Sequence, residues 1–264
     1  MHNIFRASDW SGRVRRLIFR GARRYLRKLK DDCAQGTYIR LGTEYGGWVI
    51  DKAIAEATIT PDSIIISAGA GEDISFDIDL HRLYGCHVVI VDPTPRAMAH
   101  FESLRSATIA GSKYPINSSE RFYDMSDVDL AKLHFVPAAL WSELTTIKFW
   151  EPRAGNVSYS ALNIQGTADF IEVPTTTVND LLQRYGKESL PLLKLDIEGA
   201  EVETLQAMLL DTIRPHQIAV EFDFIHRPGP KTGGLLHSII QHLRKSGYEL
   251  AHYDDLRSCL FRLR

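Results

Sequence analysis

Five short apolar segments recur along this chain, and segments with helical spacing lie between them. They read SIIISAGAG (63–71), HVVIVDP (87–93), LHFVPAAL (133–140), PLLKLD (191–196) and HQIAVEFDF (216–224). Strands that are buried on both faces have this continuous apolar character, whereas half-exposed strands alternate. We therefore predict an α/β fold whose sheet is mostly parallel, doubly wound and covered by helices on both faces.

The remaining pattern predicts the other elements of the fold. YELAHYD (248–254) and SCLFRLR (258–264) indicate an antiparallel hairpin at the edge of the sheet, and the β-rich residues from about Thr145 to Val178 indicate a small extra sheet. A loop from Thr43 is expected to lead into a helix that ends near Glu56. Further helices are expected at 74–84, 96–105, 179–185 (with Asn179 as the cap), 200–210 and 234–246.

Residues 13–30 differ from the rest of the chain in charge. They include nine basic residues and no acid, with apolar residues at near-helical spacing, which indicates a basic amphipathic helix. Such a helix either packs its apolar stripe on the main domain or on a second subunit of a homodimer, or it contacts an anionic lipid surface or an acidic partner. We divide the chain into an appendage, residues 1–35, and one domain, residues 36–264.

The composition excludes several classes of protein. The 264 residues, 44% of them hydrophobic, suffice for one large core, and a net charge of −2 gives no reason to expect a nucleic-acid partner. Three scattered cysteines form neither a disulfide framework nor a metal-binding cluster. No apolar run reaches the ~18 residues of a membrane span, and no signal peptide is recognisable. We expect a cytoplasmic protein whose membrane contact, if any, is peripheral.

The residues at the strand ends indicate a nucleoside cofactor. Gly69 and Gly71 follow the first apolar strand and allow a tight turn that approaches a ligand closely. Asp92 lies 21 residues after Gly71, at the end of the second strand and before Pro93. An acid there can accept hydrogen bonds from both ribose hydroxyls. The combination of the glycines and Asp92 is more specific than either part.

The same loop favours one cofactor over another. A dinucleotide site requires a third glycine where this chain has Ile74, and Glu72 and Asp73 put negative charge where a pyrophosphate would bind. A cofactor without phosphates that carries a sulfonium cation suits these acids better. The loop therefore favours S-adenosylmethionine over NAD.

These motifs resemble a known family. SAGAGED followed by VIVDP is similar to the first two cofactor motifs of class I S-adenosylmethionine-dependent methyltransferases, and LLKLDIEGAEVETL resembles the signature of the FkbM type. The resemblance covers roughly residues 40–264; Ser67 departs from it, because many class I enzymes have an acid at this position. It implies a Rossmann-like seven-stranded sheet of order 3-2-1-4-5-7-6 with an antiparallel last strand, and methyl transfer to the oxygen of a sugar, glycan or natural-product hydroxyl.

The acids after the fourth strand are the candidates for the chemistry. Asp196 is expected near the transferred methyl group, where it would accept a hydroxyl proton, orient the acceptor or bind the amino end of the cofactor. Lys194 projects to the same face as Asp196 and would pair with it. Glu198 is the second catalytic candidate, and Glu201 is as well explained by stabilising the start of its helix. His226 is either a general base or an ordinary polar loop residue.

Other residues are expected to complete the site. Tyr45 and Gly46 are placed across the cofactor, or else they anchor the following helix, and Ala138 is placed at the end of the third strand. We do not favour a metal; if one binds, its ligands would be Asp196, Glu221 and Asp223.

Two alternatives to a methyltransferase stay open at this stage. One is an oxidoreductase that uses NAD or a nucleotide sugar, and the other is a non-catalytic protein that keeps the cofactor pocket. The missing third glycine and the acids Glu72 and Asp73 count against the first.

Overall fold

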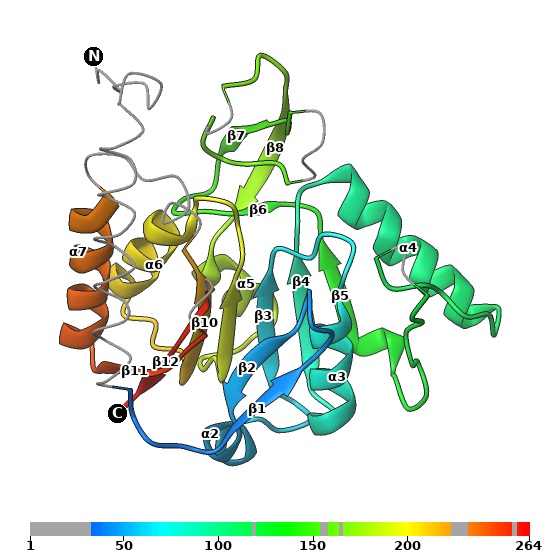
Figure 1. The fold of residues 1–264 in the computed structure, drawn as a ribbon, viewed down its shortest axis with the longest axis horizontal. Coiled ribbons are helices and arrows are strands. Elements are labelled where there is room, and N and C mark those ends of the chain that lie inside the picture. The colour runs from blue at the N-terminus through cyan, green and yellow to red at the C-terminus, as the bar shows by residue number, and fades with distance from the viewer. Residues whose placement is uncertain (1–32, 118–119, 154–157, 164–165, 223–231, 255–257) are drawn as a thin grey trace.

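The protein is an α/β domain built on a seven-stranded sheet (Figure 1). The structure, a computed structural model, describes residues 33–117, 120–153, 158–163, 166–222, 232–254 and 258–264. The helix predicted over residues 13–30 lies outside them, and the division of the chain near residue 35 stays a prediction.

The strand order of the central sheet matches the order that the family resemblance implies. From one edge to the other the strands are β5 (Leu133–Val136), β4 (His87–Val91), β3 (Ile64–Ala68), β9 (Leu192–Leu195), β10 (Gln217–Glu221), β12 (Ser258–Leu263) and β11 (Tyr248–Tyr253). β12 is antiparallel to both of its neighbours, and the pairs from β5 to β10 are parallel. The predicted C-terminal hairpin is therefore confirmed.

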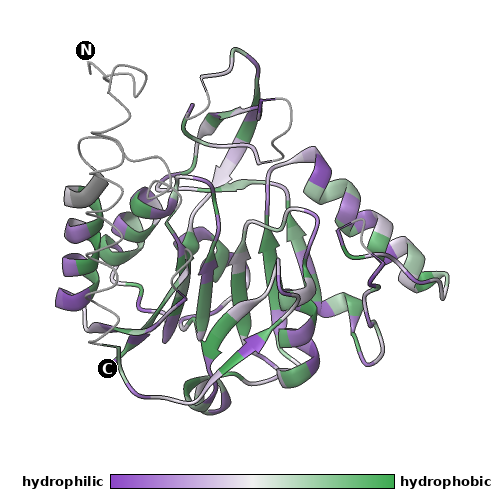
Figure 2. Ribbon diagram, in the orientation of Figure 1, coloured by the Kyte–Doolittle hydropathy of each residue, from purple (hydrophilic) through white to green (hydrophobic). Residues whose placement is uncertain are grey.

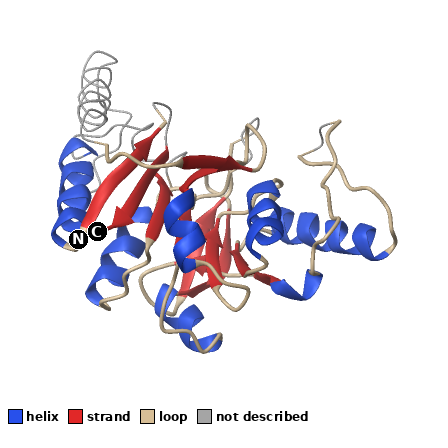
Figure 3. Ribbon diagram, turned by 90° about the horizontal axis from the view of Figure 1, so that it is seen from below, coloured by secondary structure: helices blue, strands red, loops and turns tan. Residues whose placement is uncertain are grey.

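Helices cover both faces of the sheet, and each face has its own core (Figure 3). One core contains buried residues of α2 (Lys52–Thr58), α3 (Ser75–Tyr84) and α4 (Pro95–Ile109). The other contains buried residues of α5 (Val178–Arg184), α6 (Glu201–Leu210) and α7 (Thr232–Lys245). The central strands are hydrophobic along their length, whereas the helices have two kinds of face (Figure 2). This explains why the strand segments appear in the sequence as continuous apolar runs.

The segment before α2 is a hairpin rather than the predicted loop. β1 (Tyr38–Leu41) pairs antiparallel with β2 (Trp48–Asp51), and the hairpin packs on the core of α2 to α4. Trp48 and Ile50 are buried while Val49 between them is partly exposed, so a short alternation that is typical of a half-buried strand was missed. The hairpin turn, residues 42–47, reaches the same edge of the sheet as the strand ends.

Two other predictions at element boundaries were wrong. The segment 133–140 is not one strand: β5 ends at Val136, and Ala139–Leu140 form β6 in a separate sheet with β8 (Phe170–Thr176) and β7 (Thr146–Trp150). Pro137 separates the two pieces, because a proline has no N–H for the ladder. The cap of α5 is Thr177, whose Oγ1 accepts from Asp180 N at 3.0 Å, and not Asn179.

The predicted extra sheet is confirmed, and it lies above the carboxyl ends of the central strands (Figure 1). Within the part of the chain that the structure describes, no helix is long and apolar enough to cross a membrane.

Candidate functional site

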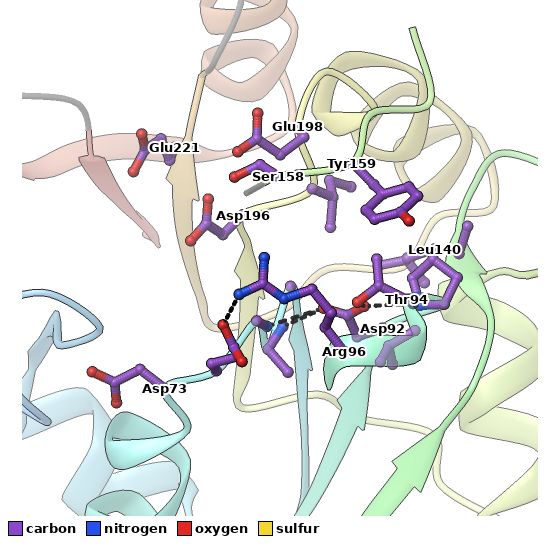
Figure 4. A pocket seen from close by; sticks show the side chains of 18 of the residues that line it. Asp73, Asp92, Thr94, Arg96, Leu140, Ser158, Tyr159, Asp196, Glu198 and Glu221 are labelled. Atoms are coloured by element: carbon purple, nitrogen blue, oxygen red, sulfur yellow. Dashed lines mark hydrogen bonds and ion pairs between the residues drawn. The ribbon is translucent and has the colours of Figure 1, made fainter. Parts of the chain in front are cut away.

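A cavity of about 410 Å³ lies at the carboxyl ends of the central strands (Figure 4). This volume is within the range of sites for small molecules and cofactors. The ends of β3, β4 and β9 form one half, which we call the glycine-loop half. The residues that the extra sheet and its loops contribute form the other, the extra-sheet half. The predicted residues that line the cavity are Tyr45, Gly46, Gly69, Gly71, Glu72, Asp73, Asp92, Pro93, Lys194, Asp196, Glu198 and Glu221.

Three predicted residues are not among the lining residues. Ala138 is buried, and the wall at this point is formed by the next two residues, Ala139 and Leu140. This shift follows from the break of the strand at Pro137. His226 and Asp223 lie outside the described residues.

The Gly69–Ala70 peptide is held at both ends. Its carbonyl oxygen accepts from Lys194 Nζ at 2.6 Å, and its N–H donates to Asp92 Oδ2 at 2.9 Å. Gly69 has a φ of +87°, and a Cβ built on it would lie 1.8 Å from the carbonyl oxygen of Asp196. Only glycine fits here, because the loop packs directly on the backbone at the end of β9.

Asp92 connects the glycine loop to the start of α4. Its Oδ2 accepts from the backbone N–H groups of Ala70 (2.9 Å) and Gly71 (3.1 Å), and its Oδ1 accepts from the N–H (2.8 Å) and hydroxyl (2.6 Å) of Thr94. These four bonds match the number of lone-pair sites of a carboxylate. A ribose hydroxyl would therefore share an oxygen that already holds the loop.

Asp73 makes contacts within the protein, and its predicted contact with the cofactor stays a prediction. Its Oδ2 accepts from the Thr43 hydroxyl at 2.6 Å, and its Oδ1 accepts from Ser75 N at 3.0 Å at the start of α3. A Cβ built on Gly46 would lie 2.5 Å from Asp73 Cγ. Asp73 lines the cavity, but these contacts show that it fixes the hairpin turn against the glycine loop.

Lys194 contacts the backbone of β3. Besides Gly69, its Nζ donates to Ala68 O at 3.2 Å and lies 5.3 Å from the centroid of the Trp48 ring. The side chain is 4% exposed. These contacts show that the ammonium supports the loop, and its predicted pairing with Asp196 stays a prediction.

A buried carboxyl that the sequence analysis did not single out lies on α3 near this lysine. Asp77 is 2% exposed, and burial raises its pKa to about 6, although the Lys194 charge and a hydrogen bond from the Ser67 hydroxyl act in the opposite direction. Its Oδ1 has no hydrogen-bond partner among the described residues.

The turn after β9 contains two residues with positive φ. Glu198 has a φ of 51° and Gly199 a φ of 105°. Positive φ at a glutamate is uncommon, and such positions cluster at functional sites. Its carbonyl oxygen accepts from the Ser160 hydroxyl at 2.6 Å, which links the turn to the extra-sheet half. Glu201 is fully buried, and its Oε1 accepts from Gly199 N at 2.9 Å, a contact that suits the structural role at the start of α6, one of the two roles left open for it.

The extra-sheet half is aromatic. The rings of Phe149 on β7 and Tyr159 are stacked at 6.3 Å with an interplanar angle of 6°, and both residues line the cavity together with Ser158 and Leu140. Burial and the nearby Glu151 raise the pKa of Tyr159, so the ring presents a neutral hydroxyl. Figure 4 shows Tyr159 on one side of the cavity and the carboxylates of Asp196 and Glu198 on the other.

Arg96 projects into the cavity from the first turn of α4 and forms an ion pair with Glu72 (Figure 4). The sequence analysis missed this residue, as it missed Phe149, Thr94 and Asn117, which also line the cavity. Thr94 could have been found: a threonine before a proline and a helical pattern is a cap signal. Arg96, Phe149 and Asn117 gave no such signal, because they are far apart in the sequence and line one cavity only in the folded chain.

The cavity is rich in carboxylates. Of the residues that the structure describes, six acids line it, Glu72, Asp73, Asp92, Asp196, Glu198 and Glu221, against the two cations Lys194 and Arg96. Such an environment suits a ligand with a cationic group and disfavours a pyrophosphate. Among the described residues no group of three or more His, Cys, Asp or Glu side chains could hold a metal ion.

Comparison with known proteins identifies one family. A model of the methyltransferase FkbM domain matches residues 3–250, a range that includes the basic segment 13–30. No curated protein sequence is similar enough to count as a match.

Several solved structures have a similar chain trace at low sequence identity. Precorrin-6y C5,15-methyltransferase from Geobacter metallireducens is 9% identical, with 80% of this chain and 85% of that chain covered and a TM-score of 0.40. A ribosomal protein L11 methylase from Lactobacillus delbrueckii subsp. bulgaricus is 11% identical, with 80% and 75% covered and a TM-score of 0.38. An rRNA methylase from Streptococcus thermophilus is 11% identical, with 80% and 93% covered and a TM-score of 0.39. We draw no conclusion from likenesses of this size.

Proposed function

Because the chain belongs to the family of FkbM methyltransferases, we propose that it transfers a methyl group from S-adenosylmethionine to a hydroxyl oxygen of a sugar or natural-product acceptor. The observation that carries this proposal is the position of Asp196. Its carboxylate lies at the end of β9, between the glycine loop and the aromatic half of the cavity (Figure 4).

The glycine-loop half fits the cofactor. A Cβ built on Gly71 would meet no atom within 4 Å, so the loop leaves open space at this point. Asp92 at the end of β4 lies where it can share an oxygen with a ribose hydroxyl, and the surrounding carboxylates suit a cation. When bound, S-adenosylmethionine supplies an electrophilic methyl group on a positively charged sulfur. The absence of a third glycine removes the close approach that a pyrophosphate requires.

The chain's own residues account for the chemistry at the acceptor. A hydroxyl must lose its proton as its oxygen is methylated, and a carboxylate within hydrogen-bond reach can accept it. We assign that role to Asp196. We assign Glu198 to orienting the acceptor. The positive φ at this residue sets the direction in which its side chain leaves the backbone. Lys194 and Asp73 support the site from outside the reaction.

The extra-sheet half supports a sugar-like acceptor. Sugar rings have apolar faces that pack on aromatic rings, and their hydroxyl groups donate hydrogen bonds to carboxylates. The stacked Phe149 and Tyr159 offer such a ring face. Glu198 and Glu221 line the same cavity and can accept hydrogen bonds from hydroxyl groups. This combination favours a neutral polyhydroxylated molecule.

Methyl transfer from labelled S-adenosylmethionine to a panel of sugars, glycans and hydroxylated natural products tests the proposal. We expect transfer to a hydroxyl acceptor, and we expect Asp196→Asn to lower kcat by about a hundredfold, the scale of lost general base catalysis. Glu102→Gln, an exposed carboxyl on α4, serves as the control and should keep the wild-type rate. Transfer to amines with no product from any hydroxyl, or an Asp196→Asn variant with full kcat, would contradict the proposal.

A further inference from the structure

Two short antiparallel segments between α4 and β5 pack on the end of the glycine loop. These arms, residues 114–117 and 120–123, are joined to each other by backbone hydrogen bonds. At the end of the first arm Asn117 lines the cavity, and its N–H donates to the carbonyl oxygen of Glu72 at 3.2 Å. Glu72 lines the cavity as well. The first arm therefore holds the loop at a residue that borders the ligand site.

The second arm holds the loop two residues later, through Tyr123. Its hydroxyl accepts from Ile74 N at 3.1 Å, and the two residues are 6% and 1% exposed. Ile74 is the cap residue of α3, and an isoleucine has no side-chain group that could satisfy an N–H at the start of a helix. The hydroxyl of a residue 49 positions away in the sequence does so instead. Without it a buried N–H would lose its partner, which is unfavourable.

His100 on α4 sets the direction of this hydroxyl. Its Nε2 lies 2.8 Å from Tyr123 Oη, and the residue is 7% exposed. Because the Tyr123 oxygen already accepts from an N–H, its own proton is available to a neutral imidazole. Burial lowers the pKa of His100, and the charges of Glu72 and Asp73 act in the opposite direction. Tyr114 of the first arm also packs against the imidazole, with the ring centroids 5.2 Å apart.

The glycine loop is thus held against α4 at both of its ends. Asp92 accepts from Ala70 and Gly71 at the start of the loop and also from the cap residue of α4. Tyr123 and His100 make the equivalent connection at the end of the loop. We propose that Tyr123, oriented by His100, is a positioning residue that fixes the end of the glycine loop for cofactor binding. This inference rests on the proposed cofactor site.

Removal of one hydroxyl tests the inference. Tyr123→Phe keeps the ring, and we expect it to weaken binding of S-adenosylhomocysteine at pH 8, measured by calorimetry, by about tenfold, because a buried N–H loses its partner. Tyr114→Phe is the matched control, since its ring is stacked on that of Tyr123 at a centroid distance of 6.4 Å. It should bind within about twofold of wild type. Equal affinity of wild type and Tyr123→Phe, or an equal loss in the control, would overturn the inference.

The dependence on pH distinguishes positioning from a general loss of stability. A protonated His100 donates to the Tyr123 oxygen, and the hydroxyl proton then has no acceptor among the described residues. We therefore expect the advantage of wild type over Tyr123→Phe to shrink as the pH falls below 6.5, the ordinary pKa of histidine. Comparison of the two proteins at each pH removes the contributions of Glu72 and Asp73, which both proteins contain.

His100→Gln serves as the conservative variant in the pH series. The glutamine cannot gain a charge, and its amide oxygen can accept from the Tyr123 hydroxyl. We expect it to bind within about threefold of wild type at pH 8 and to keep its advantage over Tyr123→Phe at pH 5. An advantage of wild type that stays constant from pH 8 to pH 5 would overturn the inference.

A measurement without ligand separates this inference from the proposed function. Hydrogen exchange at the Ile74 N–H reports how firmly the end of the loop is held. At pH 8 we expect faster exchange in Tyr123→Phe than in wild type or Tyr114→Phe. Equal rates in the three proteins would overturn the inference whatever the protein binds. The expected rates together with no binding of S-adenosylhomocysteine by wild type would overturn the proposed function and not the contact that holds the loop.

Discussion

The two halves of the cavity are held together by different interactions. In the glycine-loop half, hydrogen bonds of charged side chains determine the shape. Lys194 donates to the Gly69–Ala70 peptide and Asp92 accepts from it, while Asp73 accepts from the Thr43 hydroxyl in the hairpin turn. In the extra-sheet half, the stacked rings of Phe149 and Tyr159 form the wall.

We expect this difference to separate two tasks. A half fixed by contacts to the ends of central strands suits the binding of one fixed cofactor. A half built on a small added sheet can change its side chains without disturbing the central sheet, which is where recognition of an acceptor is expected to vary. The contact between the Ser160 hydroxyl and Glu198 O connects the two halves at the turn after β9.

The largest effect is expected at Gly69, where the glycine-loop half has no room for a side chain. Gly69→Ala places a Cβ 1.8 Å from Asp196 O at a φ of +87°. We expect a loss of more than about 4 kcal/mol in the free energy of unfolding, measured by urea denaturation, and no detectable ligand binding. Gly111→Ala is the control: its φ is +68° and a Cβ there meets nothing within 4 Å, so it should cost about 1 kcal/mol. Equal costs would show that the close packing is unimportant.

The buried carboxyl of Asp77 on α3 should make the stability of the protein depend on pH. The pKa of Asp77 is raised by burial from 3.8 to about 6. A raised pKa in the folded state contributes stability that is fully present below pH 3.8 and is lost as pH rises through about 6.

Urea denaturation of wild type and Asp77→Asn between pH 4 and 8 measures this contribution. We expect similar free energies of unfolding near pH 4, and wild type to become less stable than the variant by up to ~3 kcal/mol above pH 6, from a shift of roughly two pKa units. Taking the difference removes the contributions of other carboxyls. A difference that does not change with pH would contradict the buried, charged state of Asp77.

Asp92→Asn tests the connection between the glycine loop and α4. An amide offers one acceptor oxygen instead of two. Its NH₂ group would therefore face other donors, either the N–H groups of the loop or the N–H and hydroxyl of Thr94. We expect the dissociation constant of S-adenosylhomocysteine to rise by about a hundredfold. Asp62→Asn, an exposed carboxyl before β3, should bind as wild type does. Normal binding by Asp92→Asn would show that Asp92 does not contribute to cofactor binding.

The smallest of these effects should appear in the extra-sheet half. Tyr159→Ala removes half of the aromatic wall, and we expect it to raise the KM for the acceptor by about tenfold while the affinity for S-adenosylhomocysteine stays within about twofold. Tyr159→Phe keeps the ring and should retain most of the acceptor affinity. A loss of cofactor binding in Tyr159→Ala would show that the two halves are not separable.

The sequence predicted what depends on local pattern. Buried strands, their helices and the acids at their ends produce periodic signals, and Asp92, Asp196 and the glycines were found in this way. Trp48 to Ile50 were misread because a strand of four residues gives too short an alternation to separate from a loop. The strand break at Val136 was missed, although Pro137 in the sequence was a signal for it.

What the sequence could not predict are contacts between distant segments. The pairing of Asp73 with Thr43 and the burial of Asp77 depend on how the hairpin and α3 pack on the sheet. Asp73 and Asp77 both follow the glycine loop closely in the sequence. The sequence alone does not distinguish an acid there that contacts the ligand from one that contacts the protein. The aromatic wall is similar, because Phe149 and Tyr159 meet only after the extra sheet has formed.

The most direct test of the account is a calorimetric titration of the wild-type protein with S-adenosylhomocysteine beside one with NAD. We predict that S-adenosylhomocysteine binds at a single site, that binding is lost in Gly69→Ala, and that NAD produces no binding heat. Binding of NAD with no response to S-adenosylhomocysteine would contradict the assignment of the glycine-loop half to S-adenosylmethionine.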